Sequence, residues 1–106
     1  MPDAPWKVVE RKVCAVFGGK RRGPTGAAVS DCIGTDVAVS IKRSKRGTPL
    51  GKWITEARAF GKDEKAEWAL VVVQPGQNVS EAVVCIRLGY LAELRESPFD
   101  QTRLFE

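Results

Sequence analysis

The apolar run at 68–73, WALVVV, constrains the fold more than any other part of this sequence. A strand with one face in water alternates polar and apolar residues, whereas this run is nearly all apolar. Such a strand is buried on both faces, which places it inside a sheet that helices cover. A chain of 106 residues suits one domain, so we expect a single α/β (α+β) domain over 1–106.

Periodicity on either side of this run predicts the other elements. Apolar residues at three- and four-residue steps predict helices, and Gly18 and Gly61 are expected to end the first two. The expected helices are 5–17, 50–60 and 88–96, and the expected strands are 31–33, 36–41, 69–73 and 79–88. The order α-β-β-α-β-β-α predicts a mixed β-sheet flanked by helices, and 97–106 is expected to be a polar C-terminal tail.

The segment 31–46, DCIGTDVAVSIKRSKR, indicates a hairpin followed by a cluster of cations. Gly34-Thr35 suits a two-residue turn, and apolar residues then alternate along the second strand. This pattern puts one face of the strand on the core and leaves Ser40 and Lys42 on the solvent side. With this turn, Asp31 is expected opposite Ala38 and on the same side as Ser40 and Lys42.

Positive charge is concentrated in the first part of the chain, although the net charge is only +4. Residues 1–62 carry 13 Lys and Arg against 5 Asp and Glu, a net charge of +8, and residues 63–106 carry −4. A basic half favours binding to a polyanion such as DNA, although a solvated basic face explains the same pattern. The candidate contacts to DNA phosphates are Lys20, Arg21, Arg22 and Thr25 in a glycine-rich loop, and Arg43, Lys45 and Arg46 after the strand.

Cysteine and histidine usage narrows the possible chemistry. Cys14, Cys32 and Cys85 are odd in number, have no CxxC spacing and sit among apolar residues. We therefore expect reduced core thiols in a cytoplasmic protein and no zinc site. The absence of histidine excludes imidazole catalysis within this chain. No apolar stretch is long enough for a membrane span, and the N-terminus lacks the apolar region of a signal peptide.

The spacing of Asp31, Ser40 and Lys42 resembles the signature of the PD-(D/E)XK nucleases, in particular their Holliday-junction-resolvase-like members from phages and mobile elements. The segments GGKRRGPTG at 18–26 and VVCIRLGYLAEL at 83–94 also resemble parts of that family. The resemblance implies a restriction-endonuclease-like sheet, DNA as partner, Mg²⁺ as cofactor and a possible homodimer. It implies Asp31, Glu10 and the Ile41 carbonyl as metal ligands and Lys42 as the catalytic cation, while Ser40 stands where the family has an acid.

Three functions remain open at this point. The first is a DNA-binding protein with a nuclease-like fold and a degenerate metal site, because Ser40 is a poor ligand for Mg²⁺. The second is an active Mg²⁺-dependent endonuclease on branched or structured DNA, in which Glu10 or Glu56 replaces the missing acid. The third is a protein-interaction module on a nuclease fold that has lost nucleic-acid binding.

Overall fold

Three strands form the main sheet of the computed structural model, which describes residues 5–44 and 46–96. The strands are β3 (Val37–Arg43), β4 (Glu67–Val73) and β5 (Val83–Ile86), in the order β3-β4-β5. β3 and β4 are parallel, and β5 is antiparallel to β4. The apolar run therefore forms the central strand, as its sequence predicts. The expected tail at 97–106 lies outside the described residues.

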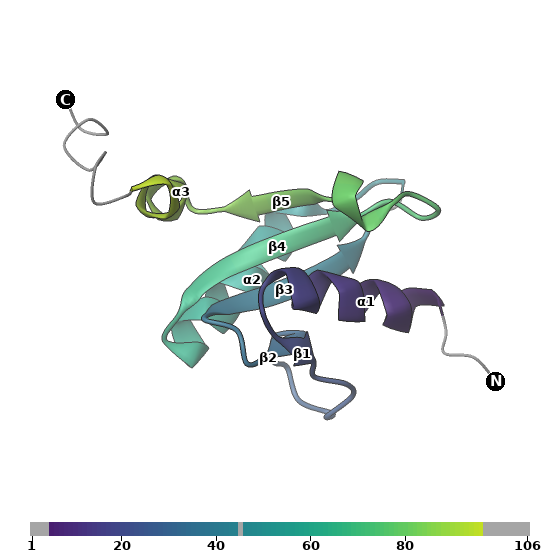
Figure 1. Ribbon diagram of the computed structural model, residues 1–106, viewed down its shortest axis with the longest axis horizontal. Helices are drawn as coiled ribbons and strands as arrows, with labels where there is room; N and C mark the ends of the chain where they lie inside the picture. Colours follow the sequence, from purple (N-terminus) through teal and green to yellow (C-terminus); the bar gives the residue numbers. More distant parts are fainter. Residues whose placement is uncertain (1–4, 45, 97–106) are drawn as a thin grey trace.

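Two long helices cover the two faces of this sheet (Figure 1). α1 (Pro5–Val16) packs through Val13 and Cys14 on the face that carries Val39 and Val71. α2 (Leu50–Glu64) packs through Trp53 and Ala57 on the opposite face, against Leu70. A third helix, α3 (Leu88–Arg95), follows β5 directly. The described residues thus form a mixed α/β structure with three α-helices, as the sequence predicts.

The expected hairpin between 31–33 and 36–41 is wrong. β2 (Cys32–Ile33) pairs antiparallel with β1 (Lys20–Arg21), and these two short strands form a separate sheet. The chain turns at Gly34, whose φ of 76° suits glycine, and β3 then joins β4 instead of β2. The chain therefore bends at Gly34, but the predicted hairpin turn does not form, and short-range patterns do not reveal that β2 pairs with Lys20–Arg21.

β3 has no solvent face over most of its length, which corrects the expected position of Ser40. Residues 37–41 are all buried, because α1 covers one side of the strand and α2 covers the other. Ser40 is 1 % exposed. Its small size allows a polar residue to lie in this layer. The alternation of residue types along β3 therefore corresponds to two faces that are both covered by helices. It does not correspond to one buried face and one solvent-exposed face.

Two element boundaries also differ from expectation. α2 continues through Gly61 to Glu64, because Gly61 is buried where the helix comes close to Trp68 and the Ala66 carbonyl. A side chain at this position would collide with the start of β4, so this glycine serves packing and does not end the helix. The expected strand at 79–88 is shorter, since a 3₁₀ turn, η1 (Val79–Glu81), precedes β5.

Cys14 and Cys32 form a disulfide, which corrects the expectation of reduced thiols. Both residues are buried as expected, Cys14 on α1 and Cys32 on β2, with their Cα atoms 5.5 Å apart. This distance lies in the usual range for a disulfide. Cys85 on β5 is a free cysteine. Within the described ranges, no helix combines the length and apolar character needed to cross a membrane.

Candidate functional site

Asp31 lies against the edge of β3 that no other main-sheet strand occupies. Its backbone N–H donates to the Val39 carbonyl at 2.8 Å, and its carboxylate Oδ2 accepts the Ile41 N–H at 2.7 Å. These two bonds lie on either side of Ser40, so Asp31 lies opposite Ser40. The expected position opposite Ala38 is therefore wrong. The free edge of β3 is thus closed at this point by one aspartate.

The electrostatic surroundings of Asp31 bring together the main residues singled out in the sequence. Partial burial raises the pKa of the Asp31 carboxyl, and the hydrogen bond from the Ile41 N–H opposes this rise. The nearby carboxylates of Glu10 and Glu56 raise the pKa further, whereas Lys42 lowers it. Glu10, Lys42 and Glu56 therefore all lie within electrostatic range of Asp31, although they come from α1, β3 and α2.

Lys42 makes its closest contact with Glu56. The Lys42 Nζ lies 2.7 Å from the Glu56 Oε1, and both side chains remain partly exposed. Lys42 projects from the α2-facing side of β3 just beyond the buried stretch, and Glu56 projects from α2 toward it. A helix carboxylate thus reaches the lysine next to Asp31. The sequence names Glu56 as one of two replacement acids, but only the structure distinguishes it from Glu10.

Ser40 does not share this polar surface. Its hydroxyl is buried and has no hydrogen-bond partner among the described residues. Since Ser40 is 1 % exposed, its side chain is out of reach of a ligand at the edge. The position that resembles the acid of the nuclease signature therefore holds an inaccessible hydroxyl.

Glu10 is held by Arg21, one of the cations expected to contact DNA. The Arg21 Nε lies 3.1 Å from the Glu10 Oε1, and both side chains are mostly buried. Arg22 is also engaged within the protein, because it donates to the Ser30 carbonyl at 2.7 Å and lies 3.6 Å from Glu64. Two of the three loop cations thus fasten the glycine-rich loop to the body.

The remaining candidate residues for DNA contact differ in their exposure and in their contacts within the protein. Lys20 is exposed and lines a depression of about 300 Å³ together with Arg11, Gly19 and Arg21. Arg43 stacks over the Trp6 ring, 5.1 Å from its centroid. Arg46 is exposed, and Thr25 accepts a hydrogen bond from the Ala27 N–H. Lys45 lies outside the described residues.

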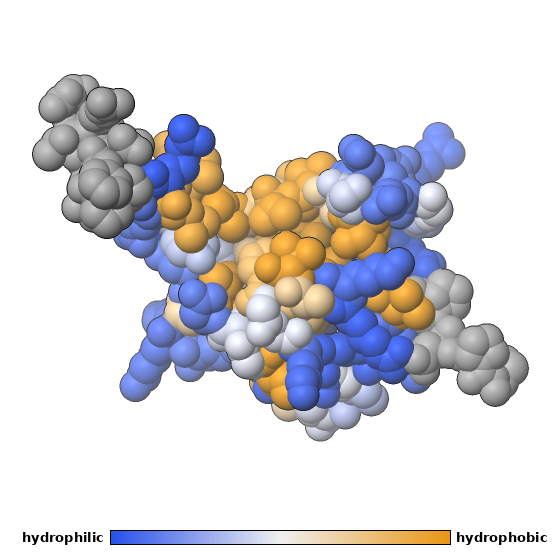
Figure 2. Space-filling view, viewed as in Figure 1, coloured by the Kyte–Doolittle hydropathy of each residue, from blue (hydrophilic) through white to orange (hydrophobic). Residues whose placement is uncertain are grey.

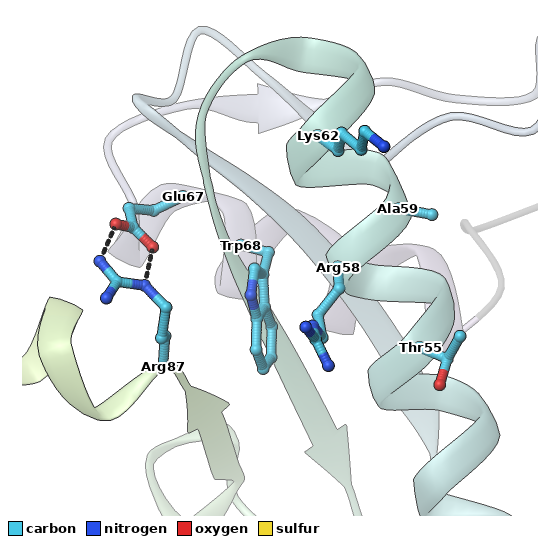
Figure 3. A pocket seen from close by; sticks show the side chains of 7 residues that line it. All are labelled: Thr55, Arg58, Ala59, Lys62, Glu67, Trp68 and Arg87. Carbon is cyan, nitrogen blue, oxygen red and sulfur yellow. Dashed lines mark hydrogen bonds and ion pairs between the residues drawn. The ribbon is translucent and has the colours of Figure 1, made fainter.

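A second cationic pocket, of about 430 Å³, lies on the other flank of α2 and was not expected from the sequence. Figure 3 shows Trp68 between Arg58 on one side and the Arg87–Glu67 ion pair on the other. Its lining residues are Thr55, Arg58, Ala59, Lys62, Glu67, Trp68 and Arg87. The spacing of four residues between Arg58 and Lys62 on a helix was the available signal for this pocket.

The donors for a metal ion are concentrated at Asp31. In a β-strand the N–H and C=O of one residue point to the same edge, so the Ile41 carbonyl faces the Asp31 side as its N–H does. Carboxylate and carbonyl oxygens are ligands that Mg²⁺ accepts. Among residues 5–44 and 46–96, however, no three acidic or cysteine side chains lie close enough to hold an ion by themselves.

The comparisons with known proteins give no match, either to a family model, to a curated protein or to a solved structure.

Proposed function

We propose that this chain binds DNA and hydrolyses its phosphodiester backbone at the edge of β3, with Asp31, Lys42 and Glu56 as the catalytic residues. The observation that carries this proposal is the convergence of two carboxylates and a lysine from separate elements beside one strand edge. Under this proposal the sheet and its helices are a variant of the restriction-endonuclease-like architecture, in which a helix supplies the second acid.

Mg²⁺ suits the oxygen donors at this edge. The Asp31 carboxylate and the Ile41 carbonyl would hold the ion, with water completing its coordination. The bound ion would polarise the phosphate and lower the pKa of a water molecule. Burial is the main cause of the raised Asp31 pKa, and the carboxylates of Glu10 and Glu56 add to it, so a divalent cation at this edge would stabilise the ionised form of Asp31. Glu10 contributes to this field, but its bond to Arg21 makes it an outer carboxylate and not a direct ligand.

Lys42 and Glu56 would divide the remaining tasks. A lysine ammonium beside the scissile phosphate stabilises the negative charge that develops on it. Glu56 holds that ammonium at 2.7 Å, and its second carboxylate oxygen remains available to a water molecule. Glu56 is partly exposed and would take up the proton that a water molecule loses as its oxygen attacks the phosphate.

The surface beside this edge would hold the phosphate backbone of the DNA. Lys20 on β1 and Arg46 after β3 are exposed cations, and Arg43 ends β3 itself. Contacts of this kind fix the position of a duplex without reading its bases. Branched DNA fits the resemblance seen in the sequence, and duplex DNA is the natural reference substrate.

The direct test is incubation of a four-way junction and a matched duplex with the protein in Mg²⁺ or Mn²⁺. We expect cleavage by the wild type and background levels with Asp31→Asn or Glu56→Gln. Glu93→Gln, which removes an exposed helix carboxylate elsewhere, should leave cleavage unchanged. Absence of cleavage in both metals overturns the enzymatic proposal, as does full activity of Glu56→Gln.

Binding without cleavage is the second candidate function, and the inaccessible Ser40 hydroxyl favours it. In that case the site lacks a third anion for Mg²⁺, and the edge serves only to hold phosphates. The protein would then bind DNA with a steep salt dependence and show no metal-dependent products. Failure to bind DNA at low salt would leave a protein-interaction module as the remaining explanation.

A cytoplasmic location belongs to this proposal. Disulfides are rare in the cytoplasm, where thiols are kept reduced. A protein that acts there must therefore bind DNA with Cys14 and Cys32 reduced as well as bonded. DNA binding that disappears on addition of a reducing agent would contradict a cytoplasmic role.

A further inference from the structure

The β5 edge and α3 expose a continuous run of apolar side chains. Val83 and Val84 on β5 are 62 % and 48 % exposed, and Leu88, Leu91 and Leu94 on α3 are 80 %, 42 % and 59 % exposed. Figure 2 shows this surface in orange, extending from α3 along the β5 side of the sheet. Apolar side chains gathered in this way usually mark an interface.

The outer edge of β5 also has backbone groups without a strand to pair with. β5 pairs with β4 on one side, and no strand among residues 5–44 and 46–96 pairs with its other side. Its outer N–H and C=O groups are therefore available to another strand. β5 is a short edge strand of 4 residues, but it carries exposed valines and no proline or lysine within Val83–Ile86, so it lacks the charged and proline residues that commonly oppose such pairing.

α3 has little to pack against in its own chain. None of its side chains is buried, and Tyr90 is the residue that reaches the core. Figure 1 shows the helix beyond the end of β5, away from α1. A helix of eight residues is not stable on its own in water, so it depends on contacts that cover its leucines.

An apolar groove of about 310 Å³ lies on the face of the sheet that α1 covers, between α1 and the start of β5. Its lining includes Val13, Val16, Phe17, Val71, Val79, Ala82 and Val84. Tyr90 packs on the cluster that contains Val13 and Val71, which places α3 on this face too. The groove lies near one end of β5 and α3 follows the other end.

We propose that two copies of this chain associate by antiparallel pairing of their β5 strands about a two-fold axis perpendicular to the sheet. Such an axis joins the sheets edge to edge and keeps α1 and α3 of both copies on one face. Glu81 precedes the strand and Arg87 follows it, so pairing centred on Val84 brings Glu81 of one copy near Arg87 of the other, in addition to the Glu67 that Arg87 contacts in its own chain. Parallel pairing in the same register would instead set like charges side by side.

This symmetry also accounts for α3 and the groove. Because α3 follows Ile86, antiparallel pairing carries α3 of the second copy toward the opposite end of β5, beside η1 and the groove. One operation therefore covers the strand edge, the leucines and the apolar groove. A second copy is the partner that carries matching strand ends and a matching helix at once. The proposal does not depend on DNA binding.

Sedimentation equilibrium over a range of protein concentrations tests this association. We expect a dimer for the wild type and a monomer for Val84→Lys, because a lysine on the edge opposes pairing. Val8→Lys on α1 replaces a similarly exposed valine, which is 38 % exposed, and should remain dimeric. A wild type that is monomeric throughout overturns the proposal, as does a Val84→Lys protein that remains a dimer.

Oxidative cross-linking tests the symmetry independently of stability. In the Cys85→Ser background, Val84→Cys puts two thiols opposite each other across the axis, with Cα atoms about 4.5–5.5 Å apart. We expect a covalent dimer on mild oxidation, and little with Ala59→Cys on the exposed side of α2. A Val84→Cys protein that cross-links no faster than Ala59→Cys contradicts the pairing. Protection from exchange, in a monomer, of the β5 amides that point away from β4 would show that the edge is covered within one chain, and this would also overturn the proposal.

Discussion

The two edges of the three-stranded sheet differ in how they are covered and in which side chains they carry. At the β3 edge, Asp31 receives the Ile41 N–H, and the β1–β2 pair lies beside it, held to α1 by the Cys14–Cys32 disulfide. At the β5 edge, the strand carries exposed valines and leads into a helix with exposed leucines. The β3 edge is closed and carries charged side chains. The β5 edge is open and apolar, which suits association.

The largest expected loss of stability comes from removing the disulfide that holds the β1–β2 pair beside the β3 edge. Replacing both Cys14 and Cys32 with serine removes a crosslink across 18 residues and should lower the free energy of unfolding by about 3 kcal/mol. Urea denaturation would measure the loss. If the two edges are independent, amide exchange should accelerate around Asp31 and Ile41 more than in β5. Equal acceleration at both edges would show that they are coupled.

The sequence accounts for the elements more successfully than for their partners. The nearly unbroken apolar run predicts β4 as the central strand, and helical periodicity predicts α1, α2 and α3. These features follow from short-range patterns of burial. The pairing of β2 with β1 depends on contacts between segments more than ten residues apart, and a hairpin with a suitable glycine turn is equally compatible with the sequence.

The candidate site shows the same division. Asp31 and Lys42 interact electrostatically, but the hairpin from which this was expected does not form, and Asp31 reaches the edge of β3 through its bonds to Val39 and Ile41. Ser40 was assigned to the solvent face, since alternation cannot distinguish a helix-covered face from water. The contacts of Glu56 and Glu64 depend on how α2 is rotated over the sheet, and this rotation is fixed by the packing of Ala57 and Gly61 against β4. Spacing along the chain carries no information on that rotation.

The next effect tests how much Asp31 contributes to closing its edge. Asp31→Ala removes the acceptor of the Ile41 N–H and should lower the free energy of unfolding by about 1–3 kcal/mol. Val84→Ala shortens an exposed side chain on the β5 edge. In a monomer it should lower the free energy of unfolding by less than Asp31→Ala does. Thermal denaturation at low protein concentration, where association is absent, compares the two variants. A larger loss for Val84→Ala would reverse the contrast between the edges.

A smaller effect is expected inside the β3 layer. Ser40→Ala removes a buried hydroxyl that has no partner, so it should leave stability unchanged or raise it by about 1 kcal/mol. Ser40→Glu should be strongly destabilising, because a carboxylate in that enclosed position lacks compensating bonds. Denaturant titration of both variants checks the pair. Folding of Ser40→Glu with wild-type stability would show that the position opens to solvent.

The smallest expected effect concerns the pH dependence of stability, which should have opposite signs at two carboxylates. The pKa of Asp31 is raised by burial, so the folded protein binds this proton more readily than the unfolded chain. The contribution of Asp31 to stability is therefore greatest below its unfolded pKa of about 3.9 and declines as pH rises through the raised value. Asp31→Asn should remove this decline from the stability profile.

Glu67, at the start of the central strand β4, should behave in the opposite way. The hydrogen bond from Arg87 lowers the pKa of Glu67, so its contribution is present above the unfolded pKa and is lost as pH falls through the folded one. Because this pair is exposed to solvent, the change should be slight and should shrink further in high salt. Urea denaturation between pH 3 and 7, compared for wild type, Asp31→Asn and Glu67→Gln, separates the two slopes. A decline with rising pH that persists in Asp31→Asn would assign the raised pKa to another group and remove one of the distinctions between the edges.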